Sequence, residues 1–146
     1  MTIQETELFA KKTAFSINSN RRIFALVGDL GAGKTTFSQF FLRALGVTES
    51  VTSPTFVIMK SYKLKTKNYK LAYHIDCYRL KNPEELLSLG FQEILADKKN
   101  IILIEWADRI RSAMPNDTMW IDFNHSGAEG ERIISINPKH EASNLK

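Results

Sequence analysis

Residues 28–35 read GDLGAGKT, and this stretch decides the fold that the sequence predicts. It consists of a glycine, four further residues and then Gly-Lys-Thr, the pattern of a loop that wraps around phosphate groups. An apolar run at residues 23–27 precedes the loop. Apolar side chains at helical spacing follow it, namely Phe37, Phe40, Phe41, Ala44 and Leu45. A strand, a glycine-rich loop and a helix in this order predict a phosphate-binding unit.

The residue types of this stretch suit the binding of a nucleoside triphosphate. Glycines let backbone N–H groups approach phosphate oxygens, and the helix that begins here points its positive end at them. We expect Lys34 to reach the β- and γ-phosphates and the Thr35 hydroxyl to ligate Mg²⁺. The Asp29 carboxylate is expected to point outward without a chemical role. The predicted nucleotide-binding residues are Gly28, Asp29, Leu30, Gly31, Ala32, Gly33, Lys34, Thr35 and Thr36.

The composition is that of an ordinary globular protein. Of 146 residues, 43% are hydrophobic and 25% are charged, which predicts one domain at residues 1–138 and a polar tail at 139–146. The net charge of +4 permits contact with nucleic acid without implying it. Cys77 is the only cysteine, which rules out an intrachain disulfide and favours a reducing cytoplasm. No apolar run approaches the length that spans a bilayer, and residues 1–12 do not resemble a signal peptide.

The rest of the chain predicts helices that alternate with strands. Helices are expected near residues 5–17 (where residues 15 and 17 would also fit a short strand), 34–45, 83–90, 91–95 and 107–113. Strands are expected at residues 23–27, 56–64, 71–76, 101–104, 119–123 and 132–137. The unbroken apolar run at residues 101–104 predicts a central parallel strand that is buried on both faces. The expected fold class is therefore α/β, a three-layer P-loop NTPase fold with a mixed, mostly parallel central sheet and antiparallel hairpins.

Two acidic residues end predicted strands, where ligands bind in sheets of this kind. Glu105 follows the most apolar strand, at the position where nucleotide hydrolases place a carboxylate on the magnesium side. Its alternative is a strand-end carboxylate that faces solvent. Asp76 could orient the attacking water or support the metal, and its alternative is to cap a helix or loop. Lys34, Asp76 and Glu105 are the predicted catalytic set, and Thr35 and Glu105 are the predicted metal ligands.

Three further residues are candidates for switch or partner-dependent roles. Thr55 lies in a loop stiffened by Pro54 and could sense the γ-phosphate and its metal, or it could bond its own backbone. Arg79 is the best internal candidate for neutralising transition-state charge, with an ordinary surface arginine as the preferred alternative. Trp106 adjoins Glu105 and either reports on the site or fills the core, which is the commoner fate of tryptophan.

Other polar residues have more ordinary explanations. His74 is expected to be a buried, hydrogen-bonded histidine rather than a ligand. The sequence contains no cluster of histidine and cysteine, so no zinc site is predicted. Five lysines of the hairpin at residues 56–76 could face RNA or an acidic protein, or could keep a solvated sheet edge from aggregating. They are Lys60, Lys63, Lys65, Lys67 and Lys70.

The ordered stretches GDLGAGKTTF, SPTF, HIDCYRL, PEELLSLGFQEIL and IEW resemble the TsaE (YjeE) family, small ATPases required in bacteria for making threonylcarbamoyladenosine in tRNA. The resemblance covers roughly residues 5–137. The phosphate loop alone is generic, whereas the ordered set is specific. The resemblance implies that residues 28–36 bind nucleotide, that Thr35 and Glu105 hold Mg²⁺, and that Asp76 and Trp106 belong to the active region. Cys77 stands where the family usually has leucine, phenylalanine or a similar residue.

The same resemblance implies protein partners, the threonylcarbamoyl transferase TsaD and its paralogue TsaB, with tRNA as an indirect client and no membrane. We therefore expect a Mg-dependent ATPase that is weak alone and stimulated by these partners. A small-molecule phosphotransferase is one alternative, but residues 83–99 contain no arginine that would mark a lid. A regulatory GTPase would need Asn-Lys-x-Asp and Asp-x-x-Gly stretches, which the sequence lacks, so ATP is preferred. A binding module without turnover is a further alternative.

Overall fold

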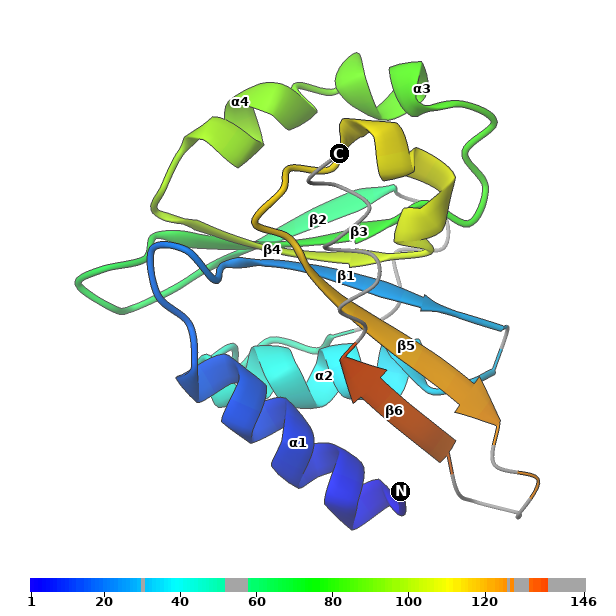
Figure 1. Ribbon diagram of the computed structural model, residues 1–146. Helices are drawn as coiled ribbons and strands as arrows, with labels where there is room; N and C mark the ends of the chain where they lie inside the picture. The colour runs from blue at the N-terminus through cyan, green and yellow to red at the C-terminus, as the bar shows by residue number, and fades with distance from the viewer. Residues whose placement is uncertain (30, 52–57, 126, 128–131, 137–146) are drawn as a thin grey trace.

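A computed structural model describes residues 1–29, 31–51, 58–125, 127 and 132–136. The helices are α1 (Ile3–Phe15), α2 (Lys34–Ala44), α3 (Pro83–Leu87), α4 (Phe91–Ala96) and the 3₁₀-helix η1 (Ala107–Ala113). The strands are β1 (Ile23–Gly28), β2 (Met59–Lys63), β3 (Leu71–Asp76), β4 (Asn100–Glu105), β5 (Met119–His125) and β6 (Arg132–Ile136). The helices that face the described sheet lie in two layers, with α1 and α2 on one side and α3, α4 and η1 on the other (Figure 1).

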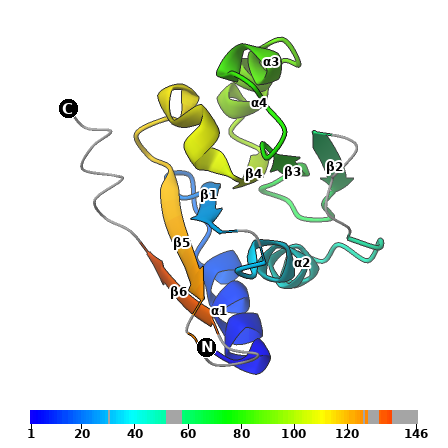
Figure 2. The ribbon, with the colours of Figure 1, turned by 90° about the vertical axis from the view of Figure 1, so that its right-hand side faces the viewer.

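The six strands form one sheet in the order β2-β3-β4-β1-β5-β6. The inner neighbours run parallel, because β1 pairs in parallel with both β4 and β5, and β3 pairs in parallel with β4. The edge strands β2 and β6 are antiparallel to their neighbours β3 and β5. Figure 2 shows the sheet almost end on, with a helical layer on each side. The predicted α/β fold class, with a mixed and mostly parallel sheet and two hairpins, is confirmed.

The inner strands divide their side chains between two cores. Phe24 and Leu26 of β1 face α1 and α2, whereas Ile23 and Ala25 face the opposite layer, as the period of two in a strand requires. All six residues of β4 are buried, so the prediction of a central strand covered on both faces is confirmed. The carboxyl ends of β1, β3 and β4 consequently lie side by side, in the registers Leu26↔Glu105 and Asp76↔Glu105.

The predicted boundaries agree with the structure at most elements, and α1 is the main exception. It begins at a capping box in which Thr2 accepts from the Glu5 amide, and it ends at Phe15 rather than residue 17. The apolar residues Leu8 and Phe9 are both predicted to face inward. Phe9 does pack against the core, but the prediction for Leu8 is wrong, because 53% of Leu8 is exposed. The buried stripe of α1 is instead made of Thr6, Ala10, Thr13 and Ala14. Small residues let this helix lie close to α2, and their low hydropathy hides the stripe in the sequence.

Local sequence signals lie at the ends of several elements. Asn82 caps α3, with its side chain accepting from the Glu85 amide and Pro83 at the first helical position. Gly46 has a φ of 94° just after α2. The strand predicted at residues 56–64 is β2, Met59–Lys63, and residues 56 and 57 lie outside the described part of the chain. The segment predicted as a helix at residues 107–113 is a 3₁₀-helix with a kink at Ile110.

Within the described ranges, every helix is too short or too polar to cross a lipid bilayer.

Candidate functional site

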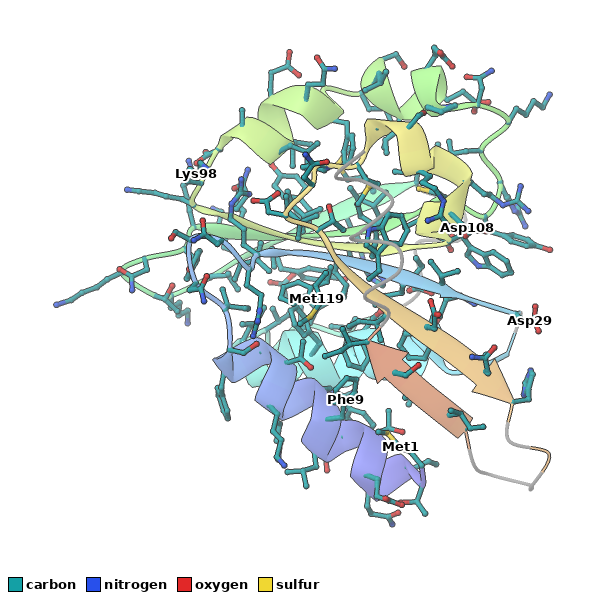
Figure 3. The ribbon with its side chains drawn as sticks, viewed as in Figure 1. Met1, Phe9, Asp29, Lys98, Asp108 and Met119 are labelled. Carbon is teal, nitrogen blue, oxygen red and sulfur yellow. The ribbon has the colours of Figure 1, made fainter. Side chains whose placement is uncertain are left out.

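The loop after β1 approaches its neighbours too closely for side chains at two positions. A Cβ at Gly28 would lie 2.1 Å from the carbonyl oxygen of Phe123 in β5. Gly33 has a φ of 106° and is the N-cap of α2, a conformation that glycine adopts without steric cost. Asp29 is exposed, and its side chain points away from the sheet, as predicted (Figure 3). Leu30 lies outside the described residues.

Lys34 is the first residue of α2 and turns its ammonium group back into the loop. Its Nζ donates to the carbonyl oxygens of Gly28 and Asp29, at 2.6 and 2.9 Å. It also lies 4.1 Å from the centre of the Trp106 ring, within the range of a cation–π contact. Only 4% of the residue is exposed. Burial lowers the pKa of the Lys34 ammonium, and nearby carboxylates, that of Glu105 first among them, oppose the shift.

The carboxylate of Glu105 joins three elements. Oε1 accepts a hydrogen bond from Thr35 Oγ1 of α2 at 3.0 Å. Oε2 lies 2.6 Å from His74 Nε2 of β3 and 3.4 Å from Ser38 Oγ of α2. Glu105 is 2% exposed and His74 is wholly buried. The prediction that His74 is a buried, hydrogen-bonded histidine is confirmed, and the solvent-facing alternative for Glu105 is wrong.

Asp76 ends β3 beside Glu105 and faces the same cavity. Its Oδ1 accepts from the Tyr78 amide at 2.9 Å, so the carboxylate does cap the following turn. A period of two along this strand, continued past Asp76, predicts that Tyr78 shares a face with His74 and Asp76. This is wrong, because the strand ends at Asp76 and Tyr78 lies in the turn. Asp76 therefore caps the turn and also lines the cavity.

Trp106 follows Glu105 with a left-handed backbone, at a φ of 58° and a ψ of 39°. Its ring packs at 4.9 Å against that of Tyr78, which is 40% exposed. The Arg109 guanidinium lies 5.4 Å from the Tyr78 ring and 5.7 Å from the Trp106 ring. Trp106 also packs against the core on the η1 side. The ring therefore contacts the core and lines the cavity, and its role as a reporter on the site stays a prediction.

A cavity of about 280 Å³ collects most of the predicted site residues. One wall is the loop and the start of α2, with Gly31, Gly33, Lys34, Thr35 and Thr36. The other wall consists of Asp76, Tyr78, Arg79, Glu105, Trp106 and Arg132. Of the other predicted nucleotide-binding residues, Gly28, Asp29 and Ala32 do not line this cavity, and Leu30 lies outside the described ranges, as does the predicted switch residue Thr55.

Sequence reasoning missed three residues of this site. Ser38 lies one helical turn after Lys34 and donates to its carbonyl oxygen at 2.8 Å as well as facing Glu105. The spacing of four on a helix was the signal that could have found it. Tyr78 was read only as a strand residue. Arg132 begins the last strand, about a hundred residues from the loop, and no local pattern links the two.

The pair of Thr35 and Glu105 fits a magnesium ion. Mg²⁺ prefers oxygen ligands and takes one or two protein groups together with phosphate oxygens and water. A hydroxyl and a carboxylate oxygen 3.0 Å apart at the foot of the loop are such a donor pair. In the described ranges, no group of three or more His, Cys, Asp or Glu side chains could hold a metal by itself. A metal that also binds the nucleotide phosphates does not need one.

Comparison with known proteins places the chain in a family. A sequence profile of the family described as threonylcarbamoyl adenosine biosynthesis protein TsaE matches residues 1–134. This chain belongs to the TsaE family. A TsaE protein from Rickettsia felis is 38% identical over 143 residues, which are 97% of this chain and 80% of that protein. A TsaE protein from Bacillus subtilis is 37% identical over 91% of this chain and 79% of its own length.

A solved structure supports the same placement of the chain in the TsaE family. The crystal structure of Bacillus subtilis YdiB superposes with a TM-score of 0.69 at 30% sequence identity. The match covers 97% of this chain and 86% of that one. The fold described above is therefore that of a TsaE-family protein, and both relatives compared by sequence carry the name of a tRNA threonylcarbamoyladenosine biosynthesis protein.

Proposed function

We propose that this chain is a Mg-dependent ATPase that supports threonylcarbamoyladenosine modification of tRNA by acting on the TsaB–TsaD transferase complex. One observation carries the enzymatic part of the proposal. A single cavity brings together the start of α2, the Lys34 ammonium and the Thr35–Glu105 oxygen pair. The pathway comes from the family and from the names of the relatives. The location that we propose is the cytoplasm, where tRNA is found.

The residues of the cavity divide the work of phosphate hydrolysis. Backbone N–H groups of the loop and the N-terminus of α2 would bind the phosphates. Lys34 would exchange its hydrogen bonds to the Gly28 and Asp29 carbonyl oxygens for hydrogen bonds to phosphate oxygens. The ammonium group would need to move little, because the phosphates would bind at the same loop. Thr35 and Glu105 would hold Mg²⁺, which neutralises charge on the transferring phosphoryl group when bound. Asp76 would orient the attacking water from the opposite wall of the cavity.

Two other functions compete with this proposal. A small-molecule phosphotransferase would use the same phosphate loop and would differ by turning over only with an acceptor. A regulatory GTPase would prefer guanine, although the sequence lacks the Asn-Lys-x-Asp stretch that reads it. Among the described residues, no contact in the cavity favours either of these functions over ATP hydrolysis.

The deciding experiment measures nucleotide turnover of the purified chain with Mg·ATP and Mg·GTP. Turnover is then measured again with purified TsaB and TsaD, with and without tRNA. We expect slow hydrolysis of ATP alone, a marked increase with the two proteins, and little hydrolysis of GTP. The Lys34→Ala variant should be inactive throughout, because it removes the loop's only side-chain cation. Fast turnover that TsaB and TsaD leave unchanged would favour a stand-alone enzyme instead.

The same assay tests the predicted switch residue Thr55. We propose that Thr55→Ala loses stimulation by TsaB and TsaD and keeps its affinity for ATP. The matched control is Thr48→Ala, an exposed threonine a few residues earlier in the chain. Full stimulation of the Thr55→Ala variant would remove Thr55 from the mechanism and leave the ATPase proposal standing.

A further inference from the structure

The first residue of β6 is held in place by its backbone. Arg132 pairs with His125 at the end of β5. Its amide also donates to the Met1 carbonyl oxygen at 3.0 Å, and its own carbonyl oxygen accepts from the Met1 ammonium group. The side chain of Arg132 therefore starts from a backbone that is bonded on two sides. This fixed origin restricts where its guanidinium can lie.

The Arg132 side chain lies directly on the phosphate loop. A Cβ built at Gly33 would come within 2.6 Å of Arg132 Cδ and 2.7 Å of Arg132 Nε. Gly33 is the residue that caps α2, so the guanidinium sits at the helix N-terminus, on the rim of the cavity that Lys34 also lines. Arg132 and Lys34 thus approach the same loop from two different elements of the fold.

The guanidinium of Arg132 has an N–H group left to bond. Its Nη1 atom is buried and, among the described residues, finds no hydrogen-bond acceptor. A buried charged donor without an acceptor is costly. The position is unfavourable for a second reason, because the N-terminus of a helix carries partial positive charge and repels a cation. An anion bound between the helix N-terminus and the guanidinium would relieve both costs.

We propose that Arg132 binds a phosphate group of the nucleotide, as a second cation of the site opposite Lys34. The proposal rests on the nucleotide binding proposed above and adds to it a residue from the last hairpin. A guanidinium presents a planar fork of N–H donors that matches the oxygens of a phosphate group. Arg79 lines the same cavity but is exposed, in the turn after β3. Arg132 is the arginine whose side chain lies against the loop itself.

The experiment measures binding of Mg·AMP-PNP, a triphosphate that is not hydrolysed, by isothermal titration calorimetry. Arg132→Gln removes the charge and keeps a side chain of similar reach. We expect its affinity to fall at least about tenfold, the usual cost of losing a hydrogen bond to a charged group. Arg132→Lys should recover part of the loss. The matched control is Arg43→Gln, the same change at an exposed position of α2, which should bind within about twofold of the parent.

Two outcomes of the titration are distinct. If the parent binds Mg·AMP-PNP and Arg132→Gln binds it equally well, the role of Arg132 is overturned and the proposed ATPase stands. If the parent itself does not bind the nucleotide, both proposals fail together. Thermal unfolding of each variant checks that the fold is kept.

A second measurement uses the parent chain and needs no variant. Phenylglyoxal modifies accessible arginines, and peptide mass spectrometry reports which ones have reacted. We expect Mg·AMP-PNP to protect Arg132 and to leave Arg43 unprotected. Equal labelling of Arg132 with and without the nucleotide would overturn the proposal, even where Arg132→Gln fails to fold.

Discussion

Glu105 is the residue at which the two halves of the site meet. One of its carboxylate oxygens faces α2 through Thr35, and the other faces β3 through His74. The sequence predicted this carboxylate from its place after an apolar strand. It could not predict the hydrogen bonds, because Thr35 and His74 are 70 and 31 residues away along the chain. The parallel pairing of β3 with β4 brings His74 to Glu105, and the packing of α2 on the sheet brings Thr35 there.

Replacing Glu105 by glutamine should reduce turnover far more than nucleotide binding. The amide keeps the size of the side chain and most of its hydrogen-bonding capacity, whereas the negative charge that would hold Mg²⁺ is lost. Loss of a preorganised electrostatic contact of this kind costs about 10²–10³ in rate. ATP turnover and AMP-PNP titration measure the two effects. Glu93→Gln, an exposed site on α4, serves as the control. Equal losses in turnover and binding would indicate a structural role for Glu105.

Cys77 is buried directly after β3, and its burial has a consequence at alkaline pH. Burial, with contributions from Asp76 and Asp108, raises the pKa of the Cys77 thiol from 9.0 to about 12. Below pH 9 the thiol is protonated in both the folded and the unfolded chain. Between these two pKa values the unfolded thiol ionises and the folded one does not. The thiol's contribution to stability is therefore lost as pH rises through this window.

We expect the free energy of unfolding to fall more steeply from pH 8 to pH 10.5 in the parent than in Cys77→Ala. The difference should be about 2 kcal/mol. Urea unfolding at the two pH values measures it, and tyrosine ionisation, common to both proteins, cancels. Parallel pH profiles would show that the thiol ionises as readily in the folded chain as in the unfolded one.

At the scale of elements, α2 connects the site to the core. Lys34 and Thr35 in its first turn face the cavity, and Phe37 and Phe41 face the sheet. The Phe37 ring lies 5.7 Å from that of Phe9 in α1 and 5.5 Å from that of Phe123 in β5. The packing of this helix against α1 and β5 therefore fixes the position of Lys34 and Thr35 at the end of the phosphate loop.

Phe37→Ala should destabilise the protein by about 3–5 kcal/mol, since it leaves a cavity between α1, α2 and β5. Phe15→Ala is the matched control, because Phe15 is 77% exposed at the end of α1 and its removal should change stability by less than about 0.5 kcal/mol. Chemical denaturation of the two variants gives both values. A loss below about 1 kcal/mol in Phe37→Ala would mean that α2 is held by other contacts.

The elements differ in how well the sequence predicted them. Strong local patterns gave β1, β4, α2 and the capped start of α3, because hydrophobic period and capping residues act within a few residues. The inner face of α1 was missed because it is made of small residues. Arg132 and Tyr78 were missed as site residues for another reason. Their places in the cavity wall depend on the order of the strands in the sheet. A local sequence pattern does not contain this order.

At the scale of the whole molecule, one sheet serves two cores. Every inner strand contributes side chains to the layer of α1 and α2 and to the layer of α3, α4 and η1. Neither layer has a sheet of its own. Loss of one layer would expose the apolar side chains of β4, all of whose residues are buried. We therefore expect the two layers to be lost together.

Unfolding should follow a single cooperative transition. Two signals can be followed in urea. The fluorescence of Trp120 reports on the core beneath η1, where this residue is wholly buried. Far-ultraviolet circular dichroism reports on all helices. The two transitions should coincide in urea, as two-state unfolding requires. Mg·AMP-PNP at a hundred times its dissociation constant should add about 2.7 kcal/mol. Two separated transitions would contradict the prediction of one domain at residues 1–138.

The left-handed backbone of Trp106 lowers the stability of the fold, whereas its ring contacts residues of the proposed site. Among the described residues, it is the one non-glycine residue with a positive φ, a conformation that costs about 1–2 kcal/mol for a residue with a Cβ. Glycine at position 106 would avoid that cost and would leave Lys34 and Tyr78 without the ring that they contact. A library of variants selected for thermal stability alone should therefore drift away from tryptophan at this position, and one selected for turnover should return to it.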